Sequence, residues 1–98
     1  MSYEADVERI IDRVLNGPGE LDPSLRQAAA NGGGLPPFVE TYVDKVRRHA
    51  YRVLDEDVQG LVAAGYTERQ VFELTHAAAF GAADLRLRRA LAVLESEV

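Results

Sequence analysis

The sequence predicts an all-α protein of about five helices that associates with further copies of itself. Along most of the chain apolar residues recur every three or four positions, strand-like alternation of useful length is missing, and Gly, Pro and Asn separate the periodic segments. A chain of 98 residues has the size of one domain. We therefore expect a single helical domain over residues 1–98, with N-terminal helices in 1–31, a glycine hinge at 32–34 and a core in 35–98.

The first two helices are expected before the triple glycine. Residues 3–15 carry one apolar stripe, formed by Tyr3, Val7, Ile10, Ile11, Val14 and Leu15. The Asn16-Gly17-Pro18-Gly19 segment ends this helix, because glycine accepts a left-handed cap and proline cannot continue the hydrogen-bond ladder. Asp22 then caps a short second helix with Pro23 at its first position, and this helix ends at Asn31.

The triple glycine at 32–34 is expected to be a hinge rather than a phosphate-binding loop. A Walker loop ends in Gly-Lys-Ser/Thr and a dinucleotide loop follows a strand, and the sequence has neither feature here. Leu35-Pro36-Pro37 opens a third helix, whose apolar stripe is Phe38, Val39, Tyr42, Val43, Val46 and Ala50. On the outer face of this helix Asp44 and Arg48 lie four residues apart and are expected to form an ion pair.

Two further helices follow. We expect Asp55 to be the N-cap of the fourth helix, whose inward residues are Val58, Leu61 and Val62. Thr67 and Gln70 form a capping box for the fifth helix, in which each side chain satisfies a backbone N–H of the other residue. This last helix is expected over about residues 68–95.

Charge and composition narrow the classes of partner. Sixteen acidic residues against eleven basic ones leave a net charge of −5, which opposes binding to nucleic acid and to anionic lipid. RNA-binding surfaces interleave aromatic side chains with basic ones, and only Tyr51 lies within the arginine clusters, which are Arg47, Arg48 and Arg52, and Arg86, Arg88 and Arg89. No apolar stretch approaches the ~20 residues of a membrane span, and the acidic N-terminus lacks signal-peptide features. We expect a cytoplasmic protein that binds neither nucleic acid nor membranes.

Self-association is expected because the chain has few large core-forming side chains. It contains three Phe, one Met and no Trp, and alanine, which contributes little burial, makes up much of its apolar fraction. The fifth expected helix carries apolar or small residues on more than one face, and residues 77–83 have the sequence Ala-Ala-Ala-Phe-Gly-Ala-Ala. Small side chains let two helix backbones approach closely, so we expect a second copy to cover this helix, with Gly81 at the close crossing.

The C-terminal half resembles one known family. The segment that runs from Asp55 through Ala63-Ala64-Gly65-Tyr66 to Thr67-Glu68-Arg69-Gln70 is similar to the helix, Ala-Gly turn and Ser/Thr cap of carboxymuconolactone decarboxylase and alkylhydroperoxidase D-like proteins. The small residues at 77–83 are similar to a run that follows in that family. The resemblance covers roughly residues 38–95 and implies an alkylhydroperoxidase D-like helical fold.

The thiol chemistry of that family is missing from this chain. The redox branch of the family has a Cys-x-x-Cys motif followed by a histidine, and the matching positions here are Ala50, Val53 and Asp57. A carboxylate of the family falls on Phe38, with Glu40 nearby. The chain has no cysteine, so thiol peroxidase and disulfide reductase activities are excluded.

Two pairs of residues could still carry chemistry. His49 borders the apolar stripe of the third helix, where a neutral histidine can act as a general base, and Glu40 lies on the same helix. Glu73 and His76 form a Glu-x-x-His unit, which ferritin-like metal sites use with a glutamate from another helix. Two chains could supply two copies of this unit, and Glu40 could complete each half. The alternatives are a surface or interface role for His49, and a solvated glutamate beside a core or interface histidine for the second pair.

These observations favour a homo-oligomeric binding or accessory protein, a cysteine-free relative of the family, for which we expect no cofactor and leave a further protein partner open. The alternative is a non-thiol enzyme. It would be a lactone decarboxylase-like catalyst that uses His49, or a metal-dependent oxidase that uses Glu73 and His76.

Overall fold

The computed structural model describes residues 3–96, and it describes the side chains from residue 5 onward. Its elements are five α-helices and one 3-10 turn: α1 (Tyr3–Asn16), α2 (Pro23–Asn31), α3 (Pro37–His49), η1 (Ala50–Arg52), α4 (Asp55–Ala63) and α5 (Glu68–Ser96). No strand occurs within residues 3–96. The all-α prediction is therefore confirmed. None of the helices in this range is both long enough and apolar enough to cross a membrane.

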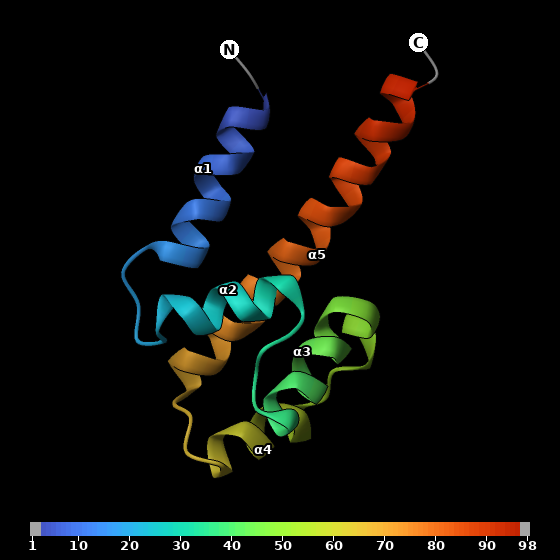
Figure 1. Cartoon of the computed structure of the whole chain (residues 1–98). Helices are drawn as coiled ribbons and strands as arrows, with labels where there is room; N and C mark the ends of the chain where they lie inside the picture. Colours follow the sequence, from blue (N-terminus) through green and yellow to red (C-terminus); the bar gives the residue numbers. More distant parts are fainter. Residues whose placement is uncertain (1–2, 97–98) are drawn as a thin grey trace.

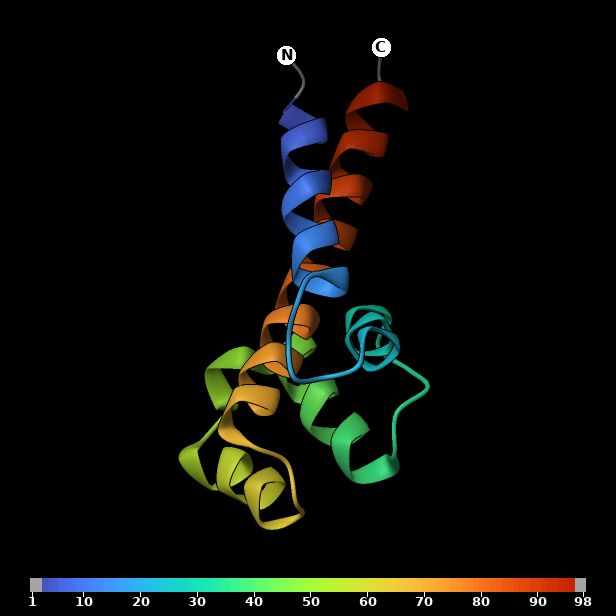
Figure 2. The same ribbon diagram turned by 90° about the vertical axis from the view of Figure 1, so that its left-hand side faces the viewer.

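The molecule consists of a packed base and a two-helix arm (Figure 1). In the base, which we define as residues 21–82, α2, α3 and α4 pack around the first half of α5. In the arm, α1 runs antiparallel to residues 83–96 of α5, so that the start of α1 and the end of α5 lie at the same tip (Figure 2). The radius of gyration is 14.6 Å, whereas a compact domain of this length has about 13 Å. The arm therefore makes the molecule elongated.

The buried residues of the hydrophobic core all lie in the base, and Val14 and Leu15 at the end of α1 pack against them. These buried residues come from the 17–21 connection, from α2, α3, α4 and α5, and from the segment between α2 and α3: Leu21, Ala29, Leu35, Val39, Tyr42, Val43, Val46, Leu61, Val71, Leu74, Ala77 and Ala78. The buried valines of α3 are Val39, Val43 and Val46, whose spacing of four and three residues places them on one face of the helix. Phe38, at the start of α3, and Ala50, in η1 after the end of α3, were expected in the same stripe but are exposed.

The run of small residues packs within the chain. A β-carbon at Gly81 would lie 2.6 Å from the Cα of Ala30, so α5 crosses the end of α2 at a distance that only glycine permits. Ala77, Ala78 and Ala82 are buried around the same crossing. The expectation that Gly81 meets a second copy is therefore wrong. The partner helix at this point is α2 of the same chain.

Most helix ends follow the predicted capping chemistry. The Asp22 side chain accepts the Ser24 N–H at 2.8 Å at the start of α2, and Gly32 ends that helix in the left-handed region with φ 81°. Thr67 and Gln70 form the predicted capping box, with distances of 2.9 and 3.0 Å. The expected ion pair on the outer face of α3 is also present, at 2.8 Å between Arg48 Nε and Asp44 Oδ1.

The start of α4 differs from the prediction by one residue. Asp55 is the first helical residue rather than the N-cap, and Leu54 precedes the helix. The carboxylate that satisfies the free end is that of Asp57, which accepts the Leu54 N–H at 2.8 Å. Three consecutive acidic residues open this helix, and the sequence pattern does not tell which of them reaches back to the backbone.

Candidate functional site

Glu73 is buried in α5 and is held by backbone amides from a distant segment. Its Oε2 accepts the N–H of Glu20 at 3.0 Å, and its Oε1 accepts the N–H of Leu21 at 3.3 Å. A β-carbon at Gly19 would collide with the same carboxylate, so glycine permits the close approach. The Arg69 Nε lies 3.5 Å from Oε2 on the exposed side. Glu73 therefore ties the connection between α1 and α2 onto α5.

His76 lies one turn further along α5 and forms part of an aromatic row. Its ring centroid is 4.2 Å from that of Phe72 and 6.0 Å from that of Phe80. The three rings follow one another at four-residue spacing, which places them on one helix face. The side chain of His76 is exposed, and both oxygens of Glu73 already accept backbone N–H groups.

The structure does not bring Glu40 to this pair within one chain. Glu40 lies on α3 beside the glycine turn, in a hollow lined by Gly32, Pro37, Thr41 and Asp44. Within residues 3–96, no three His, Cys, Asp or Glu side chains gather in a group that could hold a metal ion. A metal site that two copies of the chain complete stays a prediction.

His49 is the last residue of α3, and its exposed ring meets the edge of Tyr51 at 6.0 Å between centroids. It lines a hollow of about 590 Å³ between α3 and α4, whose wall includes the exposed ring of Phe38. Glu40 does not line this hollow, so the two weak candidates for acid–base chemistry face different surfaces. Two positions singled out by the family resemblance, those of Phe38 and Asp57, do meet here.

Two hydrogen bonds stabilise the ionised carboxylate of Asp57, so this side chain is poorly suited to act as a general base. Its Oδ2 accepts from the Lys45 ammonium at 2.9 Å and from the Leu54 N–H at 2.8 Å. These two hydrogen bonds, that of Lys45 first, hold the pKa of Asp57 below its ordinary value. Sequence reasoning missed the Lys45 contact, because it joins two helices that no local pattern relates.

Arg26 is a buried cation that sequence reasoning also missed. Only 3% of its surface is exposed. Its Nη1 donates to Val14 O at 3.0 Å and its Nη2 to Gly17 O at 2.7 Å, so the guanidinium caps the carbonyl end of α1. A signal existed in the sequence, because Arg26 stands three and four residues before Ala29 and Ala30 and therefore shares their buried helix face.

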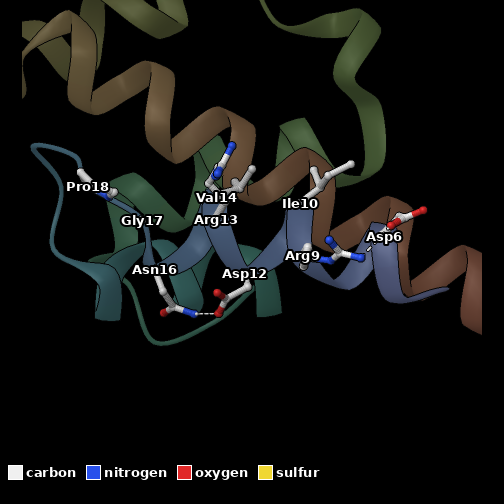
Figure 3. A pocket seen from close by; sticks show the side chains of 9 residues that line it. All are labelled: Asp6, Arg9, Ile10, Asp12, Arg13, Val14, Asn16, Gly17 and Pro18. Atoms are coloured by element: carbon white, nitrogen blue, oxygen red, sulfur yellow. Dashed lines mark hydrogen bonds and ion pairs between the residues drawn. The ribbon is translucent and has the colours of Figure 1, made fainter. Parts of the chain in front are cut away.

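A wider hollow of about 800 Å³ runs along α1 to Pro18 (Figure 3). Four of its polar side chains pair within α1: Arg9 binds Asp6 at 3.0 Å and Asn16 donates to Asp12 at 2.8 Å. Ile10 is exposed on this side of α1. This hollow is therefore an open groove that contains an exposed apolar side chain. It does not have the converging polar groups of a catalytic site.

Comparisons of the chain with protein-family models, with curated proteins and with solved structures found no match. The resemblance to carboxymuconolactone decarboxylase-like proteins therefore stays a prediction, and the function must be argued from the geometry alone.

Proposed function

We propose that the chain is a homo-oligomeric binding or accessory protein and that its arm is the surface on which two copies associate. The observation that carries the proposal is the distribution of burial. Among the described side chains every buried one lies between Leu21 and Ala82, and none belongs to α1 or to residues 83–96. The arm therefore keeps no core of its own within a single chain.

The uncovered arm is apolar on several sides. Its large exposed hydrophobic side chains are Ile10 on α1 and Leu85, Val93 and Leu94 on α5. Each residue turns an α-helix by about 100°, so these three positions of α5 point in widely different directions. A neighbouring helix of the same chain covers only one side. Exposed apolar surface over so wide an arc is typical of an interaction site.

Charge favours a second copy as the partner. Residues 3–16 contain four acidic and two basic side chains, whereas residues 84–96 contain two acidic and three basic ones. Within the chain the two helices already form an ion pair, in which Arg88 Nη2 lies 3.7 Å from Glu8 Oε1. In a two-fold symmetric four-helix bundle each α1 also lies beside the α5 of the other copy, where the same complementarity applies.

Sedimentation equilibrium at micromolar concentration tests this proposal. Wild-type protein should sediment as a dimer or larger oligomer, and Leu94→Lys should sediment as a folded monomer, because a lysine in the interface must be desolvated. The matched control is Leu54→Lys, the same substitution at a residue that is 56% exposed, compared with 61% for Leu94, and that lies away from the arm. Wild-type protein that is monomeric, or variants that behave alike, would refute the proposal.

The enzyme alternative is less well supported by the geometry. Both carboxylate oxygens of Glu73 accept backbone N–H groups, and His49 and Glu40 line different hollows. Metal analysis of protein purified without a histidine tag separates the two proposals. Stoichiometric iron or manganese that disappears in His76→Ala would favour the oxidase over the binding role.

A further inference from the structure

A small hollow of about 200 Å³ lies where the arm joins the base. The end of α1, the connection to α2, α2 itself and the first half of α5 all contribute side chains to it: Arg13, Val14, Pro18, Arg26, Arg69, Phe72, Glu73 and His76. The exposed apolar side chains that carry the proposed self-association surface do not line it, and Glu73 and His76 are its only lining residues that the sequence offered as site candidates. The hollow thus combines basic and aromatic groups in one place.

The charge of this hollow is positive, although the chain as a whole carries −5. Three guanidinium groups line it, against the single carboxylate of Glu73. That carboxylate is already engaged by the Glu20 and Leu21 amides and by Arg69. Among the described side chains, those of residues 5–96, no acidic one forms an ion pair with Arg13. The arginines of the hollow therefore outnumber the carboxylates beside them, and this excess positive charge would attract an anion.

Arg26 supplies an independent sign that the hollow lacks a partner. Its two Nη atoms donate to the neutral carbonyls of Val14 and Gly17. Among the described side chains no carboxylate forms an ion pair with it, and the Asp22 carboxylate acts on it only at longer range. Its buried Nε has no hydrogen-bond partner among the described residues. A buried cation without a counter-ion is costly, and a bound anion beside it would lower that cost.

The wall of the hollow suits a flat apolar group. The ring centroids of Phe72 and His76 lie 4.2 Å apart with their planes inclined by 40°, and Pro18 of the connection lines the same hollow. The Arg69 guanidinium already stands over the Phe72 ring, 5.4 Å from its centroid. A ligand that carries a carboxylate next to a planar ring would place each part against matching chemistry.

We propose that this hollow binds a small organic carboxylate with a planar apolar body. Arg13 and Arg69 contact the carboxylate at the rim, Arg26 provides charge beneath it, and Phe72 and His76 contact the ring. The volume is below the ~300 Å³ at which pockets for drug-sized ligands begin, so the ligand is no larger than a one-ring acid. This inference names the ligand of the binding role proposed above, and it does not depend on self-association.

Titration of ¹⁵N-labelled protein with millimolar benzoate tests the inference. The amides of Glu20 and Leu21 report on the hollow because they donate to Glu73, and Gly33 serves as a remote reference. We expect saturable shift changes at the two reporters but not at Gly33. Benzyl alcohol, which has the same ring without the charge, should produce no saturable change. Absence of saturation with benzoate, or an equal response to benzyl alcohol, would overturn the inference.

Two arginine variants place the binding in this hollow. Arg69→Gln should weaken benzoate binding about tenfold, because a charge-assisted hydrogen bond is lost. Arg69 is 60% exposed at its side chain, so the fold should survive its replacement. Arg89→Gln removes the same charge about 30 Å further along the helix and should leave binding within about twofold. Equal weakening by both variants would assign the effect to net charge and overturn the inference.

Sedimentation in the same buffer separates this inference from the proposed association. A dimer that fails to bind benzoate would overturn the ligand assignment and leave self-association standing. A monomer that binds benzoate, and binds it more weakly after Arg69→Gln, would refute self-association and support the ligand assignment.

Discussion

At the scale of single residues, Glu73 shows how one buried charge can organise a chain connection. Only 7% of its surface is exposed, and such burial costs free energy unless the carboxylate is hydrogen-bonded. The backbone N–H groups of Glu20 and Leu21 supply those bonds. The connection between α1 and α2 has no regular structure of its own, so this contact sets the path on which α1 leaves the base.

Replacing this carboxylate should loosen the connection. Glu73→Gln keeps the shape of the side chain but turns one acceptor into a donor that faces an N–H group, so we expect a loss of about 1–3 kcal/mol in the free energy of unfolding. Urea denaturation near neutral pH measures it. Glu40→Gln, at an exposed glutamate of α3, should change stability by less than about 0.5 kcal/mol. Equal effects of the two substitutions would contradict the role assigned to Glu73.

Asp57 should make stability depend on pH in the acid range. Its folded-state pKa lies below the ordinary aspartate value of 3.8, because of the hydrogen bonds from Lys45 and Leu54. The stabilisation is therefore complete above the unfolded pKa and is lost as the pH falls through about 4 towards the lower folded pKa. Thermal denaturation from about pH 6 to pH 3 should show a smaller acid-induced drop for Asp57→Asn than for wild type. Parallel curves would show that Asp57 contributes nothing to this drop.

At the scale of elements, α5 behaves as two different helices in one. Its first half is covered by α2, α3 and α4, and small residues bring the α2 backbone close at Gly81. Its second half packs against α1 on one side, and near its start Arg86 donates to the Arg47 carbonyl of α3 at 2.8 Å. The helix remains continuous because Ala, Leu, Arg and Glu all favour helical backbone and because no proline interrupts residues 68–96. Local propensity maintains the arm, whereas tertiary packing stabilises the base.

The crossing of α5 over α2 predicts opposite outcomes for one substitution at two helical glycines. Gly81→Ala should destabilise the fold by about 1–3 kcal/mol, because the new methyl group would overlap the backbone of Ala30. Gly60→Ala meets only the ring of Phe38 at 3.4 Å, an ordinary contact, so the higher helix propensity of alanine should stabilise α4 by up to about 1 kcal/mol. Chemical denaturation of both variants checks the signs. A stabilising Gly81→Ala would contradict the close crossing.

At the scale of the whole molecule, the shape is itself unusual for so short a chain. The principal extents are 51 × 28 × 21 Å, and the long direction follows the arm (Figure 1). A compact packing of the same five helices would fold α1 and the end of α5 back onto the base. The chain instead leaves Ile10 and Leu94 in water, which is the free-energy cost that self-association would remove.

The proposed association through the arm would make thermal stability depend on protein concentration. If two copies cover the arm, the melting temperature of wild-type protein should fall by several degrees over about a hundredfold dilution, because dilution shifts the coupled equilibrium towards unfolded chains. Leu94→Lys should melt at one temperature over the same range. Differential scanning calorimetry measures both proteins. A wild-type melting temperature that does not change with protein concentration would contradict association over this range.

The positions of the helices follow from the sequence because capping and chain-breaking chemistry is local. Asp22 meets a backbone N–H two residues away, and Thr67 and Gln70 satisfy each other within one turn. Such contacts need no information from the remainder of the chain. Sequence also determined that no thiol chemistry is available, since the chain has no cysteine.

Only the tertiary structure decided which residues meet. Glu73 binds amides 52 and 53 residues away, and Gly81 packs against Ala30 of the same chain rather than against a second copy. The candidates Glu40 and His49 were found from the sequence but line different hollows, while the arginine-lined hollow at the arm was not foreseen. Periodicity reports which face of a helix is apolar. Which neighbour covers that face depends on how the connections place the helices in space, and no local pattern encodes that placement.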